Sequence, residues 1–197
     1  MKIFGARHGE ALRQADYATG TDFCRIFEND MNRLYLLALL LTADRDFAEK
    51  CFVRGLEDAK ASNPVFQDWA ESWARRTIII NAIRLLTPHA GKTTSLRNGF
   101  TPVELPELPL KLSAILGLAT FERFVFVMSV LEGYPDRDCK LLLNCSGTDF
   151  AEARIRALRQ LAASADWVGD REAQIAGLHS DMDDCESKIL PHLEVSP

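Results

Sequence analysis

The chain has 197 residues, with 23 lysine and arginine residues against 28 aspartate and glutamate residues. Hydrophobic residues make up 47% and charged residues 26%, a composition typical of a soluble globular protein and not of a disordered one. This length suits one ordinary domain or two small ones. The longest apolar run, 34–41, is far shorter than the roughly 20 residues that span a bilayer, and the first residues lack the apolar core of a secretory signal. We therefore expect a cytoplasmic protein that has no membrane partner.

The negative charge is concentrated at the C-terminal end. Residues 162–197 carry 2 basic and 8 acidic side chains, whereas the rest of the chain carries 21 and 20. The part before this acidic tail is therefore almost neutral. Dedicated duplex-binding domains are usually basic, so a DNA-binding unit in this chain would bind DNA weakly by itself.

Neither a metal site nor an active site is predicted. The five cysteines are Cys24, Cys51, Cys139, Cys145 and Cys185. They show no CxxC pairing, and their number is odd, so small apolar residues of a reducing compartment are the simpler interpretation. The four histidines are scattered along the chain, with no spacing typical of a catalytic triad. We predict no enzymatic activity and no cofactor.

The first half of the chain has a helical pattern. Residues 1–20 are aperiodic and are expected to form a loose leader. Asp22 can cap a first helix, and a second helix, apolar almost all round, follows it as the centre of a small bundle. Asp44 or Asp46 can cap a third helix. After a turn at Asn63-Pro64, a long helix is expected over 66–86.

A stretch rich in proline, glycine, threonine and serine at 88–108 is predicted to be a flexible linker. In the second half, Thr120 can cap a helix that Gly133 ends, and Pro135 suits the first turn of the next helix. Asn144, a residue type that tolerates left-handed backbone, opens a corner that leads into a last helix. By spacing alone this unit can be a DNA-reading helix-turn-helix or a corner used only for packing.

The expected fold is therefore all-α, with two small helical domains joined by a flexible linker. The predicted organisation is a leader at 1–20, a helical domain at 21–87, the linker at 88–108, a helix-turn-helix domain at 109–161 and an acidic extension at 162–197. No internal repeat is visible.

Two blocks of the sequence resemble RNA polymerase sigma factors of the extracytoplasmic-function type. "RLYLLALLLTADRDFAEKCFVRGLEDA" is similar to their second region, and "ERFVFVMSVLEGYPDRDC" followed by "LLLNCS" is similar to their fourth. The blocks stand in the family's order, with a linker between them, and the resemblance covers Thr21–Leu161. It implies a region-two-like bundle and a region-four-like helix-turn-helix.

The resemblance implies three sets of site residues. Polymerase binding falls on Asp44, Asp46, Ala48, Glu49, Lys50 and Arg54. Promoter opening falls on Trp69, Trp73, Arg75, Arg76, Asn81 and Arg84. Promoter reading by the helix-turn-helix falls on Thr148, Asp149, Ala151, Glu152, Arg154, Arg156 and Arg159. Aromatic rings can stack on unpaired bases, and arginine pairs with phosphate or guanine.

Simpler interpretations stand beside these assignments. Trp69 and Trp73, four residues apart, can share one core stripe of a helix, and Arg75 and Arg76 can be solvated surface residues. The sequence also departs from the family where "AEA" at 151–153 replaces basic and hydroxyl residues of the recognition helix. A carboxylate at that place repels phosphate.

The function expected from the resemblance is transcription initiation, with core RNA polymerase and promoter DNA as partners. The resemblance also allows an anti-sigma protein as a third partner. The alternative is a divergent sigma-like module for protein interaction or regulation that no longer reads promoters. A thiol or metal enzyme would need cysteines that meet in space, and Cys139 and Cys145 are the closest pair in the sequence.

Overall fold

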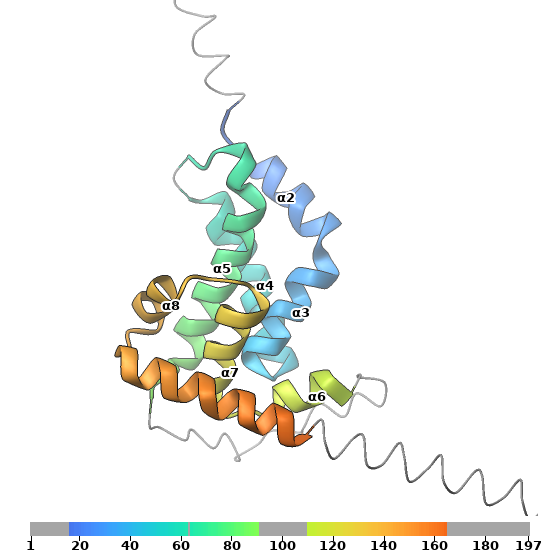
Figure 1. Cartoon of the computed structure of the whole chain (residues 1–197). Helices are drawn as coiled ribbons and strands as arrows, with labels where there is room; N and C mark the ends of the chain where they lie inside the picture. Colours follow the sequence, from blue (N-terminus) through green and yellow to red (C-terminus); the bar gives the residue numbers. More distant parts are fainter. Residues whose placement is uncertain (1–15, 63, 91–109, 165–197) are drawn as a thin grey trace, which may run out of the picture.

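The computed structural model describes residues 16–62, 64–90 and 110–164, and its architecture is helical (Figure 1). The helices are α2 (Gly20–Asn29), α3 (Met31–Thr42), α4 (Arg45–Lys60), a short 3-10 turn η1 (Gln67–Trp69), α5 (Ala70–Leu86), α6 (Leu110–Leu116), α7 (Thr120–Phe126), a π-helical turn η2 (Val127–Leu131) and α8 (Asp136–Leu143). A last helix covers residues 147–164. These parts of the chain contain no β-strand, only an isolated bridge between Tyr17 and Phe66. The all-α prediction is confirmed.

Helix α2 begins with a capping box. The Thr19 hydroxyl accepts a hydrogen bond from the Asp22 backbone N–H, and the Asp22 carboxylate accepts one from the Thr19 backbone N–H. Such reciprocal bonds satisfy backbone donors that have no partner within the first turn. The prediction that Asp22 is itself the cap was wrong: Asp22 lies three residues inside, and Thr19 is the cap.

Helices α3, α4 and α5 form the bundle around which the other helices pack. Most of α3 is buried, as its nearly continuous apolar sequence predicts. Ala43 takes a left-handed conformation at its end, and Asp44 then accepts a bond of 2.8 Å from the Phe47 N–H. Of the two candidates, Asp44 is thus the cap of α4.

Helices α4 and α5 approach closely at Gly55. A Cβ atom at this position would lie 2.6 Å from Cδ1 of Ile78, whose side chain is fully buried in α5. Contact this short requires a residue without a side chain. The long helix predicted over 66–86 is present as α5, but its first residues form the 3-10 turn η1.

The second half starts with α6 and α7. Thr120 is the first residue of α7 and makes no capping bond, so the predicted cap at Thr120 was wrong. The helix continues into η2, where the Glu132 N–H bonds the Val127 carbonyl five residues earlier, at 2.9 Å. Gly133 follows with φ of 67° and ends the helix as predicted.

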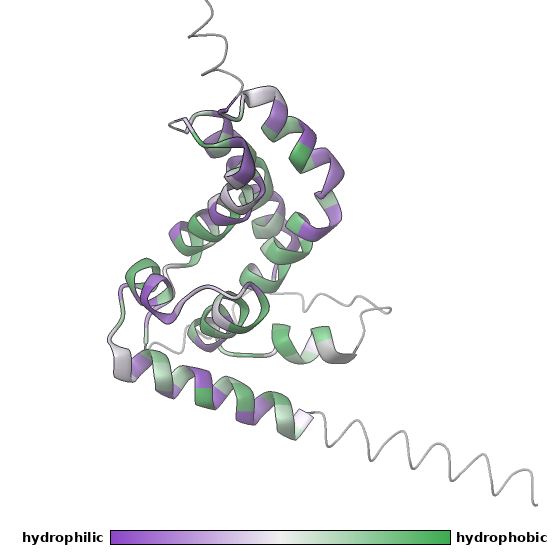
Figure 2. Ribbon diagram, turned by 45° about the horizontal axis from the view of Figure 1, so that its top comes forward, coloured by the Kyte–Doolittle hydropathy of each residue, from purple (hydrophilic) through white to green (hydrophobic). Residues whose placement is uncertain are grey.

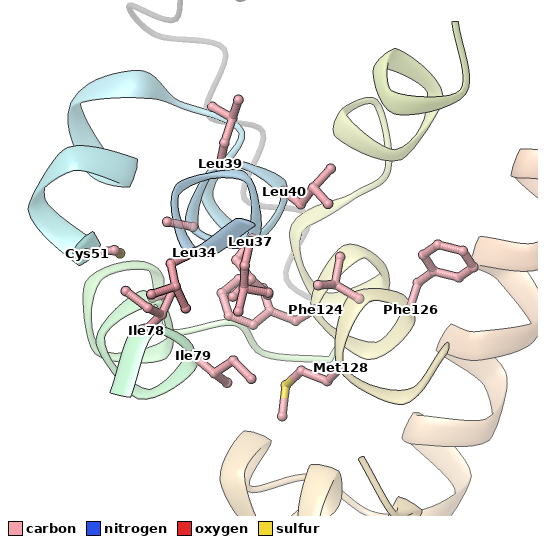
Figure 3. Packing of buried hydrophobic residues seen from close by; sticks show 14 of the residues in the cluster. Leu34, Leu37, Leu39, Leu40, Cys51, Ile78, Ile79, Phe124, Phe126 and Met128 are labelled. Atoms are coloured by element: carbon pink, nitrogen blue, oxygen red, sulfur yellow. The ribbon is translucent and has the colours of Figure 1, made fainter. Parts of the chain in front are cut away.

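The two halves share one hydrophobic core. Phe124 of α7 points towards α3 and α5, whereas Phe126 points the other way, towards the last helix (Figure 3). The predicted linker 88–108 lies mostly outside the described residues. The division into two separate domains therefore stays a prediction. In the described residues, helices of both halves pack against each other.

A buried arginine joins the halves. Arg123 of α7 is only 4% exposed. Its guanidinium donates to the carbonyls of Leu41 (3.2 Å) and Thr42 (3.4 Å) at the end of α3, and to those of Leu116 (3.3 Å) and Leu118 (2.9 Å) at the end of α6. Helix C-termini carry partial negative charge, so these carbonyls stabilise the buried cation. Burial nevertheless lowers the pKa of Arg123 to about 10.

Candidate nucleic-acid interface

A tight corner joins α8 to the last helix. Asn144 has φ of 47° and ψ of 53°, the left-handed conformation predicted for it. The N–H of Asn144 bonds the Lys140 carbonyl, and the N–H of Cys145 donates to the same carbonyl at 3.2 Å. The bond from Cys145 spans six residues, as in a Schellman helix end, and the bond from Asn144 spans five residues, as in the simpler αL helix end. The next helix starts three residues after Asn144, so the two helices meet in a short, defined turn.

The last helix begins with a side-chain cap from Ser146. The Ser146 hydroxyl accepts from the Asp149 N–H (3.1 Å) and donates to the Asp149 carboxylate (2.7 Å). Asp149, predicted to contact DNA, is thus occupied in capping the helix. The Ser-x-x-Asp spacing is a sequence signal for this arrangement, and the sequence analysis missed it.

One face of the last helix packs inward and the opposite face is open. Phe150, Ala153 and Ala157 are buried. The exposed residues of the open face are Thr148, Ala151, Glu152, Ile155, Arg159 and Ala162. This open face carries one acidic and one basic residue. Figure 2 shows hydrophobic and hydrophilic residues alternating along this helix. Of the predicted promoter-reading residues, four therefore lie on the open face where a ligand can reach them: Thr148, Ala151, Glu152 and Arg159.

Two predicted DNA-reading arginines form ion pairs with the chain's own carboxylates. Arg154 lies 2.9 Å from Asp136 at the start of α8, and Arg156 lies 2.9 Å from Glu122 in α7. Arg156 also lies 3.4 Å from Glu152, one turn earlier in the same helix. These contacts connect the last helix to α7 and α8. They also offset the positive charges of Arg154 and Arg156, which were expected to bind DNA.

An aromatic cluster lies before α5. Tyr17 stacks on Phe66 with ring centroids 4.8 Å apart, and Trp69 meets the Phe66 ring edge-on at 5.4 Å. Trp69 is 64% exposed. Backbone bonds from Ala18 N–H to the Val65 carbonyl and from Gln67 N–H to the Asp16 carbonyl fix this arrangement.

The aromatic cluster decides between the two interpretations of the tryptophans. Trp69 is open to solvent, whereas Trp73 is half-buried and its Nε1 has no hydrogen-bond partner among the residues that the structure describes. The two rings therefore do not share a core stripe. Tyr17 and Phe66 were missed, because no sequence spacing links residue 17 to residue 66.

The other predicted promoter-opening residues divide into two groups. Asn81 is buried and Arg84 is exposed, and both bond the carboxylate of Asp58, at 3.0 Å and 2.8 Å. Arg75 lies 3.8 Å from Glu132, and the charge of Arg76 partly offsets the pKa rise that burial causes at Tyr134. Arg75 and Arg76 thus face the second half of the chain.

The burial of Glu132 predicts a pH effect. Burial raises the pKa of Glu132 above its ordinary value of 4.5, and Arg75 and Arg33 offset part of the rise. The folded protein then holds this proton more tightly than the unfolded chain, so the associated stability is complete below pH 4.5 and is lost as pH rises through the folded pKa. We expect Glu132→Gln to become more stable than the unaltered protein as pH rises, measured by urea unfolding at about pH 4 and about pH 7. A stability difference that is equal at both pH values would contradict this assignment.

The predicted polymerase-binding residues lie along α4. Asp46, Glu49, Lys50 and Arg54 are exposed, while Asp44 is occupied as the helix cap and Ala48 is buried. Val53, 54% exposed, lies among them. The result is an open helix face with both signs of charge around an apolar centre, which we call the α4 face.

The described residues also include two buried thiols and one cavity. Burial raises the pKa of the Cys51 and Cys139 thiols to about 11, which makes them poor nucleophiles. A cavity of about 160 Å³ lies between α3, α5 and Glu132, lined by leucines and by charges of both signs. Within the described ranges, no group of three side chains could hold a metal ion.

Comparisons with protein-family models, with curated proteins and with solved structures give no match to this chain. Within the described parts of the chain, none of the helices has the length and apolar character needed to cross a bilayer.

Proposed function

We propose that the chain is a sigma-like transcription initiation protein that binds core RNA polymerase and directs it to promoter DNA. The observation that carries this proposal is the unit formed by α8, the left-handed Asn144 and the last helix. It has a tight corner, and its second helix keeps one face open. In a DNA-reading helix-turn-helix this second helix enters the major groove.

The α4 face supports binding to the polymerase. Val53 is an exposed apolar residue with the charged residues Glu49, Lys50 and Arg54 around it. This arrangement is compatible with the apolar centre and polar rim of a protein interface. Residues 44–54 are also those that the family resemblance assigns to polymerase binding.

The aromatic cluster supports contact with unpaired promoter bases. The exposed ring of Trp69 contacts Phe66 edge-on, and Phe66 in turn stacks on Tyr17. Such a ring offers a flat apolar surface on which a base can stack. In this proposal residues 21–87 act as the region-two-like unit and 109–161 as the region-four-like unit. Core polymerase supplies the tether that compensates for weak DNA binding.

The decisive experiment is retention of core RNA polymerase on the immobilised full-length chain at low salt. The proposal expects retention, weakened by Arg54→Glu on the α4 face and unchanged by Arg25→Glu on α2, where Arg25 is equally a surface residue. Run-off transcription on genomic fragments then tests promoter use. Absence of polymerase binding would refute the proposal.

A second candidate function is a protein-interaction or regulatory module without promoter reading. The observation in its favour is that Arg154 and Arg156 are paired with the chain's own carboxylates. Because these pairs also hold the last helix, Thr148→Ala combined with Arg159→Ala is the cleaner test. The sigma-like function expects lost transcription from target promoters, whereas the module expects an unchanged cellular effect.

A further inference from the structure

From the open face of the last helix we infer that Glu152 reads a cytosine in the major groove, and that Thr148, Ala151 and Ile155 contact neighbouring thymine methyl groups. This inference rests on the proposed function and names the kind of promoter element that the site would take.

The two arginines lie at the flanks of the open face. Successive residues of an α-helix are about 100° apart around its axis, so Arg154 and Arg156 lie on either side of Ile155, which is 48% exposed at the centre. Arg154 bonds Asp136 of α8, and Arg156 bonds Glu122 of α7, so the two side chains lie on opposite flanks of the open face. Phosphates run along both edges of the major groove, so these positions suit backbone contact and not base reading.

The residues that remain at the centre have a defined chemistry. They fall in the first turns of the helix, which contact base edges in helix-turn-helix proteins. A carboxylate is an acceptor only, and the cytosine amino group is the donor that it matches. The alanine, threonine and isoleucine side chains offer methyl groups, which match the thymine methyl. Small side chains also let the helix approach the bases closely.

The charge of Glu152 is partly neutralised before DNA binds. Arg156 Nη1 lies 3.4 Å from its carboxylate, and the Glu122 side chain, only 15% exposed, holds Arg156 through Nε at 2.9 Å. Glu122 thus acts as a positioning residue. With a guanidinium beside it, the Glu152 carboxylate meets less repulsion from phosphates than its position in the sequence suggests.

The test is selection from a library of duplex DNA with a randomised upstream element, using the full-length chain bound to core RNA polymerase. We expect the unaltered protein to enrich one C·G pair beside A·T pairs whose thymines face the helix. Because glutamine pairs with the adenine N6 and N7 atoms, Glu152→Gln should change the preferred base at that position from cytosine to adenine. Glu152→Ala should lose the preference by about tenfold. Glu28→Gln, the same change at an exposed residue of α2, should alter nothing.

The outcomes separate this inference from the proposed function. Base preferences that are identical in the Glu152 variants overturn the inference, as does a guanine preference that disappears with Arg154→Ala. If polymerase is retained but no sequence is enriched, the inference fails while polymerase binding stands. If polymerase is not retained in the same samples, the proposed function fails and the inference fails with it. An apolar protein partner that competes with DNA for the open face would likewise overturn it.

Discussion

Replacing Arg123 with methionine is expected to lower the free energy of unfolding by about 3 kcal/mol or more. The methionine fills much of the same volume but leaves the carbonyls of α3 and α6 without their donor, and each buried group without a partner costs about 1–3 kcal/mol. Because Arg123 bonds both halves of the chain, the loss should appear as one cooperative shift of the transition. Urea unfolding followed by circular dichroism measures it.

Two further variants make the Arg123 result interpretable. Arg123→Lys keeps the positive charge but has fewer donors in a less suitable geometry, so its loss should be intermediate. Arg25→Met removes an exposed arginine of α2 and should change stability by less than about 0.5 kcal/mol. Equal stabilities for Arg123→Met and the unaltered protein would mean that the contact between α7 and α3 contributes nothing to the fold.

Truncation of Phe124 to alanine is expected to cost about 3–5 kcal/mol, the range for removing a buried aromatic ring. Phe124 is fully buried and points from α7 into the space between α3 and α5 (Figure 3). The surrounding helices cannot collapse fully into the cavity, since each is fixed by its own contacts. Equilibrium urea unfolding gives the change directly.

The matched control is Phe124→Leu, which keeps most of the apolar volume and should cost less than about 1.5 kcal/mol. If the first half folds independently of the second, its helices will keep their unfolding midpoint in Phe124→Ala while the second half unfolds earlier. A single transition that shifts as a whole would indicate one cooperative unit.

Local signals were sufficient for most helix boundaries. Asp44, Gly133 and Asn144 each act within their own turn, through a cap or a left-handed conformation that the residue type favours. Gly133 and Asn144 lie where they were predicted, and Asp44 is one of the two caps predicted for α4. The two capping errors, at Asp22 and Thr120, each placed the cap at a residue inside the helix. Thr19 caps α2 in place of Asp22, and Thr120 is inside its helix, because the final choice depends on how the preceding chain enters the bundle.

The candidate site was less predictable, because its charges are paired over long distances in the sequence. Arg154 and Asp136 are 18 residues apart, and Arg156 and Glu122 are 34 apart. No periodicity of a single helix reveals such pairs, which exist only once α7, α8 and the last helix have packed. The partners decide which side chains of the last helix are available to a ligand.

The π-helical turn η2 makes the orientation of the last helix depend on the number of residues between Val127 and Leu131. Its bonds span five residues, so the turn holds one residue more than an α-helical turn would. A natural variant lacking one residue between Val127 and Leu131 would close into a regular α-helix. Everything after it would then be rotated by about 100° and displaced by about 1.5 Å along the axis. The partly exposed side chains of Val130 and Leu131 can vary in type, but the number of residues here fixes the direction in which the last helix presents its open face.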